Sequence, residues 1–279
     1  MEVTVAKTAG FCFGVKRAVD TVYEQIGTGE VYTYGPIIHN EEVMRDLEEK
    51  GVKILQDLDA LEQITSGKIV IRSHGVAKAV YDRVEAKGLE LIDATCPFVK
   101  KIHKIVWDET ERGNDVIIVG NASHPEVQGI MGWCRKPPFV IETAKAAEDF
   151  DEEIAENACI VAQTTFNMTK FKDVLDIFGK KGYNLTVYNT ICNATQERQT
   201  ETRQLASEVD AMIVIGSINS SNTQKLYDIS KTECENTYYI QTLVDLDLTA
   251  FESVSRVGIT AGASTPNNII KEVLIACQR

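Results

Sequence analysis

The sequence feature that most constrains the fold of this chain is a regular alternation of β-branched apolar runs with amphipathic stretches. Runs such as KIVIRS, DVIIVG, CIVAQT, LTVYNT, AMIVIG and RVGITA predict buried strands. The stretches between them, such as NEEVMRDLEEK, MTKFKDVLDIFGKK and TRQLASEVD, predict helices. Because strands alternate with helices, the pattern favours an α/β fold with mostly parallel sheets.

A coarser repeat is marked by cysteine. Cys12, Cys96 and Cys192 each close a strand-like run and precede a helix-like one, at intervals of about 90 residues. The first two turns after Cys192 are polar, so the third helix has the weakest support. The repeat predicts three similar α/β domains, which comprise residues 14–95, 96–191 and 192–279 and are joined by an N-terminal strand over residues 1–13.

The start of a helix stabilises a thiolate, because it offers unpaired N–H groups and the positive end of the helix dipole. No CxxC motif occurs, which argues against a zinc finger and most ferredoxin-like sites. Three thiolates from separate domains suit a 4Fe–4S cluster with one iron left without a protein ligand, or a three-cysteine zinc site with an open position. The plainer alternative is that each cysteine fills a small apolar space. Cys159 and Cys277 fit that role, while the sequence around Cys134 and Cys234 indicates no particular role for either residue.

Polar clusters follow the carboxyl ends of several predicted strands, where parallel α/β sheets bind ligands. Their side chains are His39, Asn40, His74, His124, Glu126, Gln163, Thr164, Thr165, Asn219, Ser220, Ser221, Asn222, Ser264 and Thr265. Together with helix N-termini they suit a diphosphate, and no P-loop motif is present. Glu126 is the one carboxyl in the set that could deliver protons. Each cluster could also be an ordinary cap or turn, and the mid-helix His103 is interpreted as structural.

Net charge, apolar runs and the number of cysteines exclude further classes of protein. The chain has 279 residues and a net charge of -12, which disfavours nucleic-acid binding because phosphate neutralisation needs clustered Lys and Arg. We expect no signal peptide, because the amino terminus MEVTVAKTAG has neither a basic n-region nor an apolar h-region. We also expect no membrane span, since no apolar run approaches about 20 residues. The chain has seven cysteines, and because no export signal is expected, we predict a cytoplasmic protein without disulfides.

The motifs GFCFGVKRA, GPIIHN, RSHGV, DATCPFVKK, SHPEV, AQTTF, IGSINSSNT and TAGAST, in this order, resemble the LytB/IspH family of 4-hydroxy-3-methylbut-2-enyl diphosphate reductases. The resemblance runs along the whole chain. It implies three α/β domains in a pseudo-threefold cloverleaf around a central 4Fe–4S cluster with one iron not ligated by protein. It also implies the last step of the non-mevalonate isoprenoid pathway, with electrons from ferredoxin or flavodoxin. The reaction is the reductive dehydroxylation of the allylic diphosphate to isopentenyl and dimethylallyl diphosphate.

The resemblance also assigns roles to residues. Cys12, Cys96 and Cys192 would ligate the cluster, and Glu126 would relay protons while Thr164 orients the substrate hydroxyl. The side chains around the substrate would be His39, His74, His124, Thr164, Ser220, Ser221, Asn222 and Ser264, with His124 also in the catalytic set. Asn193 stands where some family members have an aromatic residue.

Three other interpretations stay open at the level of sequence. A quinolinate-synthase-like dehydratase also has three α/β units and three cluster cysteines, and analysis of the product would distinguish it. A zinc-dependent hydrolase or zinc-binding module is separated by metal content. A non-catalytic, cluster-bearing regulator is separated by an activity assay.

Overall fold

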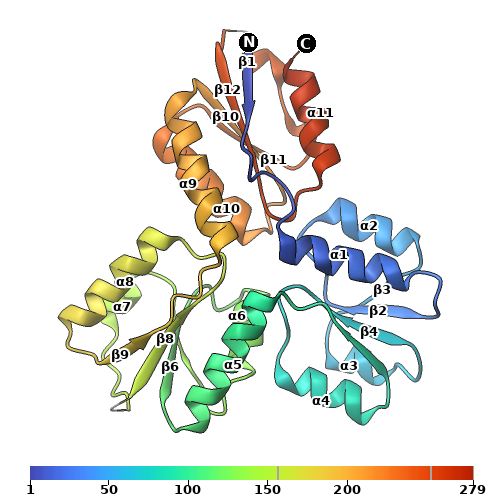
Figure 1. Ribbon diagram of the computed structural model, residues 1–279, viewed down its shortest axis with the longest axis vertical. Coiled ribbons are helices and arrows are strands. Elements are labelled where there is room, and N and C mark those ends of the chain that lie inside the picture. The colour runs from blue at the N-terminus through green and yellow to red at the C-terminus, as the bar shows by residue number, and fades with distance from the viewer. Residues whose placement is uncertain (156, 252, 279) are drawn as a thin grey trace. The chain divides into compact units, whose positions relative to one another are not determined.

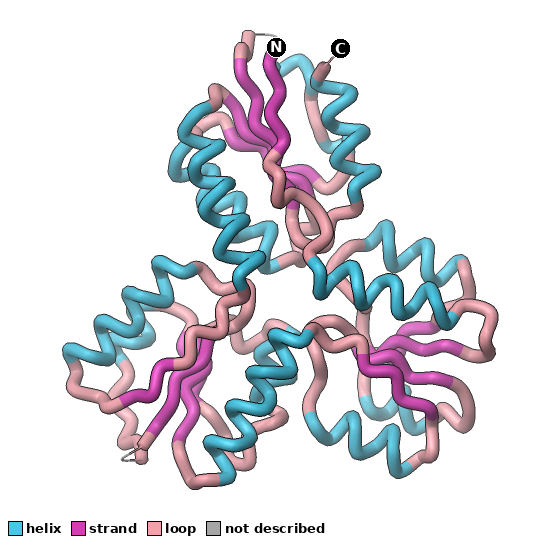
Figure 2. Tube along the Cα trace, viewed as in Figure 1, coloured by secondary structure: helices cyan, strands magenta, loops and turns pink. Residues whose placement is uncertain are grey.

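The computed structural model describes residues 1–155, 157–251 and 253–278, whose helices and strands alternate along the chain (Figures 1 and 2). The strands are β1 (Glu2–Val5), β2 (Val31–Tyr34), β3 (Lys53–Leu55), β4 (Lys68–Ile71), β5 (Glu90–Asp93), β6 (Asp115–Val119), β7 (Phe139–Ile141), β8 (Ala158–Ala162), β9 (Leu185–Val187), β10 (Ala211–Ile215), β11 (Thr237–Ile240) and β12 (Arg256–Ala261). The α-helices are α1 (Phe13–Gln25), α2 (Glu41–Glu49), α3 (Leu58–Glu62), α4 (Lys78–Ala86), α5 (Pro97–Glu111), α6 (Pro125–Met131), α7 (Ala144–Asp149), α8 (Met168–Lys180), α9 (Asn193–Glu208), α10 (Ser221–Glu233) and α11 (Asn267–Cys277). Short 3-10 turns cover Leu243–Asp245 and Leu248–Phe251.

The strands form three four-stranded sheets in which every described pairing is parallel. Their orders are β1-β12-β10-β11 (sheet A), β3-β2-β4-β5 (sheet B) and β7-β6-β8-β9 (sheet C). The predicted α/β class with three sheets is therefore confirmed. The carboxyl ends of neighbouring strands are in register, as where Val119 of β6 pairs with Ala162 of β8.

Helices cover both faces of these sheets, which explains why central strands such as β8 and β10 are continuous apolar runs. Every residue of β8 and β10 is buried. Along β10, Met212 packs with Leu205 of α9, while the next residue, Ile213, packs with Val273 of α11 on the opposite face. In Figure 1, α5 and α6 lie on one side of sheet C and α7 and α8 on the other.

The chain forms two compact units by its internal contacts. The first contains residues 1–16, 38–45 and 193–279 and includes sheet A, and the second contains residues 17–37 and 46–192 and includes sheets B and C. In the first unit, β1 pairs with β12, so the amino terminus completes the last sheet. The three domain boundaries predicted from the cysteine repeat, and the cloverleaf arrangement, stay predictions.

The predicted strands and helices are all present, including the helix after Cys192, which is α9. None of the described helices is long and apolar enough to cross a membrane.

Candidate active site

The most specific feature of the second unit is a buried carboxylate bound at both oxygens by one residue. Glu126, in the first turn of α6, is 2% exposed. Its Oε1 accepts the backbone N–H of Thr164 at 2.6 Å, and its Oε2 accepts the Thr164 hydroxyl at 2.8 Å. Burial raises the pKa of Glu126 to about 7, although both hydrogen bonds from Thr164 act to lower it. A carboxyl with such a pKa can hold or release a proton near neutral pH.

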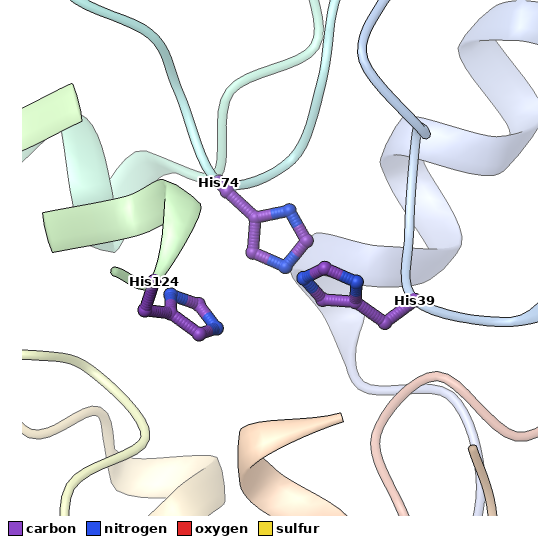
Figure 3. Close-up of side chains that lie close together, drawn as sticks. All are labelled: His39, His74 and His124. Carbon is purple, nitrogen blue, oxygen red and sulfur yellow. The ribbon is translucent and has the colours of Figure 1, made fainter. Parts of the chain in front are cut away.

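Two imidazoles lie beside this pair in the same unit. His124 is the N-cap of α6, where its Nδ1 accepts the N–H of Glu126 at 3.1 Å. His74 lies on the loop after β4, and its ring centroid is 5.5 Å from that of His124 in an edge-to-face arrangement (Figure 3). The structure thus places His74, His124, Glu126 and Thr164 after the carboxyl ends of β4, β6 and β8, where the sequence predicts them.

In the first unit, the turns after β10 and β12 supply hydroxyl and amide groups. Ser220 is the N-cap of α10 and accepts the backbone N–H of Thr223 at 3.3 Å, and Ser221 begins the helix. Asn222 in the first turn is 5% exposed, and no described protein group forms a hydrogen bond with its buried Nδ2. A buried N–H group without an acceptor costs about 1–3 kcal/mol. An acceptor that bound to this amide would remove that cost.

Ser264 joins the two turns and the segment that carries His39. Its Oγ lies 3.5 Å from Oγ of Ser220 and donates to the carbonyl of His39 at 3.0 Å. His39 precedes α2 and is labelled in Figure 3. Within this unit, the structure therefore brings together three of the predicted diphosphate-binding positions, at His39, Ser220 and Ser264.

The three repeated cysteines each stand immediately before a helix, as predicted. The N–H of Cys12 donates to the Ala263 carbonyl at 3.3 Å, and α1 begins at the next residue. Cys96 is the N-cap of α5 and its N–H donates to Ser73 at 2.9 Å. The N–H of Cys192 donates to Thr164 at 3.1 Å, immediately before α9. All three are half-buried rather than in a core.

The other four cysteines differ from this set. Cys159, Cys234 and Cys277 are buried and belong to hydrophobic clusters, and Cys134 is half-buried against another cluster. Burial raises the pKa of the Cys134 and Cys159 thiols to about 12, so both stay protonated. Among the described residues, which include all seven cysteines, there is no disulfide.

Two contributors to the site were not singled out from sequence. Arg17 on α1 donates to the carbonyls of Asp93 and Thr95 at 3.1 and 3.0 Å, and so fixes the backbone just before Cys96. Glu41 at the start of α2 accepts hydrogen bonds from the turn after β10, including one from Ser217 at 2.9 Å. Arg17 stands in the quoted motif GFCFGVKRA and Glu41 in the predicted helix NEEVMRDLEEK. Their partners lie far along the chain, and no local signal reveals such contacts.

The fold and these side chains define a class: an α/β protein of three parallel sheets, with polar side chains after the carboxyl ends of its strands and, in the second unit, a buried carboxyl whose pKa of about 7 suits proton transfer.

The particular family follows from comparison with known proteins. Residues 3–278 match the family described as LytB protein, and the chain belongs to that family. A 4-hydroxy-3-methylbut-2-enyl diphosphate reductase of Caldanaerobacter subterraneus subsp. tengcongensis is 44% identical over 278 residues, which are 98% of this chain and 96% of that protein. The enzyme of the same name from Clostridioides difficile is 40% identical and covers 98% of each chain. The resemblance stated from the motifs is therefore confirmed.

Two solved structures agree with this assignment. The structure of the E-1-hydroxy-2-methyl-but-2-enyl-4-diphosphate reductase from Plasmodium falciparum has a TM-score of 0.93 at 27% identity, and covers 100% of this chain and 88% of that one. A structure of (E)-4-hydroxy-3-methyl-but-2-enyl diphosphate reductase, described as the terminal enzyme of the non-mevalonate pathway, has a TM-score of 0.71 at 43% identity, with 100% and 99% covered.

Proposed function

We propose that this chain reduces (E)-4-hydroxy-3-methylbut-2-enyl diphosphate to isopentenyl diphosphate and dimethylallyl diphosphate, the last step of the non-mevalonate pathway. Relatives named for this reductase activity are 44% and 45% identical over nearly the whole chain, which supports the activity and the reaction. In the structure, the observation that carries the chemistry is the buried Glu126 carboxyl, bound at both oxygens by Thr164.

The reaction breaks the carbon–oxygen bond of the allylic alcohol. Two electrons and two protons enter, and the oxygen leaves as water. We assign the proton that accompanies this oxygen to Glu126, because burial keeps its pKa at about 7 and makes it a proton donor at neutral pH. The Thr164 hydroxyl donates to Glu126, so its own oxygen lone pair remains to accept the substrate O–H and orient it. The second proton reaches either end of the allylic system, which gives the two products.

Because the chain has no lysine-rich phosphate-binding loop, other hydrogen-bond donors must bind the diphosphate. We assign it to His39, His74, His124, Ser220, Ser221, Asn222 and Ser264. The buried Nδ2 of Asn222, and the N-terminus of α10 that Ser220 caps, support this assignment because both offer N–H groups to an anion.

The thiols fit an iron–sulfur cluster held by three cysteines. Cys12, Cys96 and Cys192 each lie at a helix start and are half-buried, while Cys159, Cys234 and Cys277 are packed in cores. We propose that the first three hold a 4Fe–4S cluster with one iron not ligated by protein. When bound, such a cluster supplies the electrons and a Lewis-acidic iron. A small redox protein, ferredoxin or flavodoxin, would replace the electrons.

The test is turnover of the allylic diphosphate by protein purified without oxygen, with reduced methyl viologen as the electron source. Wild-type protein is expected to form both products. Glu126→Gln is expected to lose about a hundredfold or more of this turnover while still binding the diphosphate. Glu85→Gln, which changes an exposed carboxylate on α4 of the same unit, is the matched control and should keep normal turnover. Near-normal turnover in Glu126→Gln would refute the assigned role.

A further inference from the structure

Glu41, the first residue of α2, makes an unusual set of contacts for an exposed carboxylate. Its Oε1 accepts from Ser217 Oγ at 2.9 Å and from Asn219 Nδ2 at 3.0 Å, and its Oε2 accepts from Gln241 Nε2 at 2.8 Å. The donors are neutral side chains from the turn after β10 and the residue after β11. Burial acts to raise the pKa of Glu41, but the hydrogen bonds from Ser217, its own backbone and Asn219 hold that pKa below its ordinary value.

The bound turn leads directly into the proposed diphosphate-binding residues. Ser217 is fully buried, and its Oγ also accepts the N–H of Asn219 at 3.1 Å, so one hydroxyl both shapes the turn and binds Glu41. Tyr239 OH donates to the Ser217 carbonyl at 2.7 Å. The next residue after Asn219 is Ser220, the N-cap of α10, from which Asn222 follows in the first helical turn.

The segment that carries Glu41 also carries His39, which lies two residues earlier in the chain. The His39 carbonyl accepts from Ser264 Oγ at 3.0 Å. In the short segment from His39 to Glu41, the first residue is therefore hydrogen-bonded to the turn after β12 and the last residue to the turn after β10. All of these hydrogen bonds lie within the first compact unit.

We propose that Glu41 is a positioning residue, which holds the His39 segment and the Ser220–Asn222 turn in the arrangement that binds the diphosphate. This inference rests on the proposed function, since it assumes that these residues take that ligand. A carboxylate has the same sign of charge as a diphosphate. Simple repulsion therefore predicts that removing Glu41 tightens binding, whereas positioning predicts that binding weakens.

The test compares Glu41→Ala, Glu41→Gln and Glu42→Ala by calorimetry with inorganic diphosphate. Glu42 is the matched control, because it is the neighbouring acid on α2 and its ion pair is with Arg45 of the same helix. We expect binding about tenfold weaker in Glu41→Ala and changed by less than about twofold in Glu42→Ala. Glu41→Gln keeps an acceptor oxygen for Ser217 and Asn219 and should recover most of the affinity.

Steady-state kinetics on the allylic diphosphate give the second readout. Glu41→Ala should raise KM by a similar factor and leave kcat nearly unchanged, since Glu41 is not assigned to the reacting hydroxyl. Equal or tighter diphosphate binding in Glu41→Ala, or an equal loss in Glu42→Ala, would overturn the inference, as would wild-type protein that does not bind diphosphate. Wild-type protein that binds diphosphate without reducing the substrate would instead refute the proposed function.

Discussion

The buried Glu126 should hold a proton near neutral pH, and this can be measured directly. Its pKa is raised from 4.5 to about 7, chiefly by burial, which corresponds to about 3 kcal/mol in favour of the protonated form. Infrared difference spectra of the folded protein should therefore contain a carboxylic-acid band that disappears as the pH rises through about 7. Glu126→Gln should remove this band.

Thr164→Val provides the directional test. The Thr164 hydroxyl donates to Glu126 at 2.8 Å and stabilises the ionised carboxylate, while the backbone N–H stays in place in the variant. Loss of one hydrogen bond to a charged group, about 1.5–3 kcal/mol, should raise the pKa of Glu126 by about one to two units. A band that titrates near 4.5 in the wild type, or a pKa that falls in Thr164→Val, would refute this account of the site.

The same shift links stability to pH. Because the folded pKa of Glu126 lies above the unfolded value, the folded chain binds the extra proton between pH 4.5 and about 7. The contribution of Glu126 to the free energy of unfolding is therefore fully present below pH 4.5 and falls as the pH rises through this window, by at most about 3 kcal/mol. In denaturant titrations, Glu126→Gln should lack this part of the pH dependence, and an unchanged slope would count against it.

Two further predictions concern the cysteines and a glycine. Cys96→Ala should lose iron and acid-labile sulfide in elemental analysis, whereas Cys159→Ala, a buried strand residue, should keep both; equal loss would undermine the ligand assignment. Gly75→Ala should lower the free energy of unfolding by more than Gly182→Ala. Both glycines have positive φ, but a Cβ at Gly75 would lie 2.5 Å from Cε1 of His103, whereas one at Gly182 meets nothing within 4 Å. Equal denaturation midpoints for the two variants would contradict this prediction, because they would show that the loop around Gly75 accommodates the methyl group without loss of stability.

The sequence predicts the central strands of the fold well, because a strand buried on both faces must be apolar throughout. Strands β8 and β10 have that pattern, and β6 has it after its first residue, Asp115. Strand β2 is central in sheet B but reads VYTY, and its Thr33 is fully buried, so no apolar run marks it. Edge strands such as β3 and β7 are only three residues long and give too short a pattern.

Helix α9 shows why the third helix was the least predictable. Its buried face is polar as far as Thr202: Arg198 donates to the Ala261 carbonyl at 2.6 Å, and Thr202 exchanges a hydrogen bond with Thr260 at 3.0 Å. Hydrogen bonds to the neighbouring strand β12 replace apolar packing in this part of the helix, so hydrophobic periodicity is absent there. The first two turns are predicted only by their place after Cys192, whereas the second half, which contains TRQLASEVD, is also predicted by its own pattern.

The site is predictable where a side chain follows directly from the end of a strand. His74, Glu126, Thr164 and Ser220 were placed by this rule. The pairing of Glu126 with Thr164 joins residues 38 positions apart, and the contacts of Glu41 span far more of the chain, so only the folded structure reveals them.

The most direct test of the central claim is product analysis after anaerobic incubation of the intact protein with (E)-4-hydroxy-3-methylbut-2-enyl diphosphate and reduced methyl viologen, with iron and sulfide counted in the same sample. The account predicts isopentenyl and dimethylallyl diphosphate from protein that holds about four irons and four sulfides per chain. Unreacted substrate in the presence of such an intact cluster would contradict it.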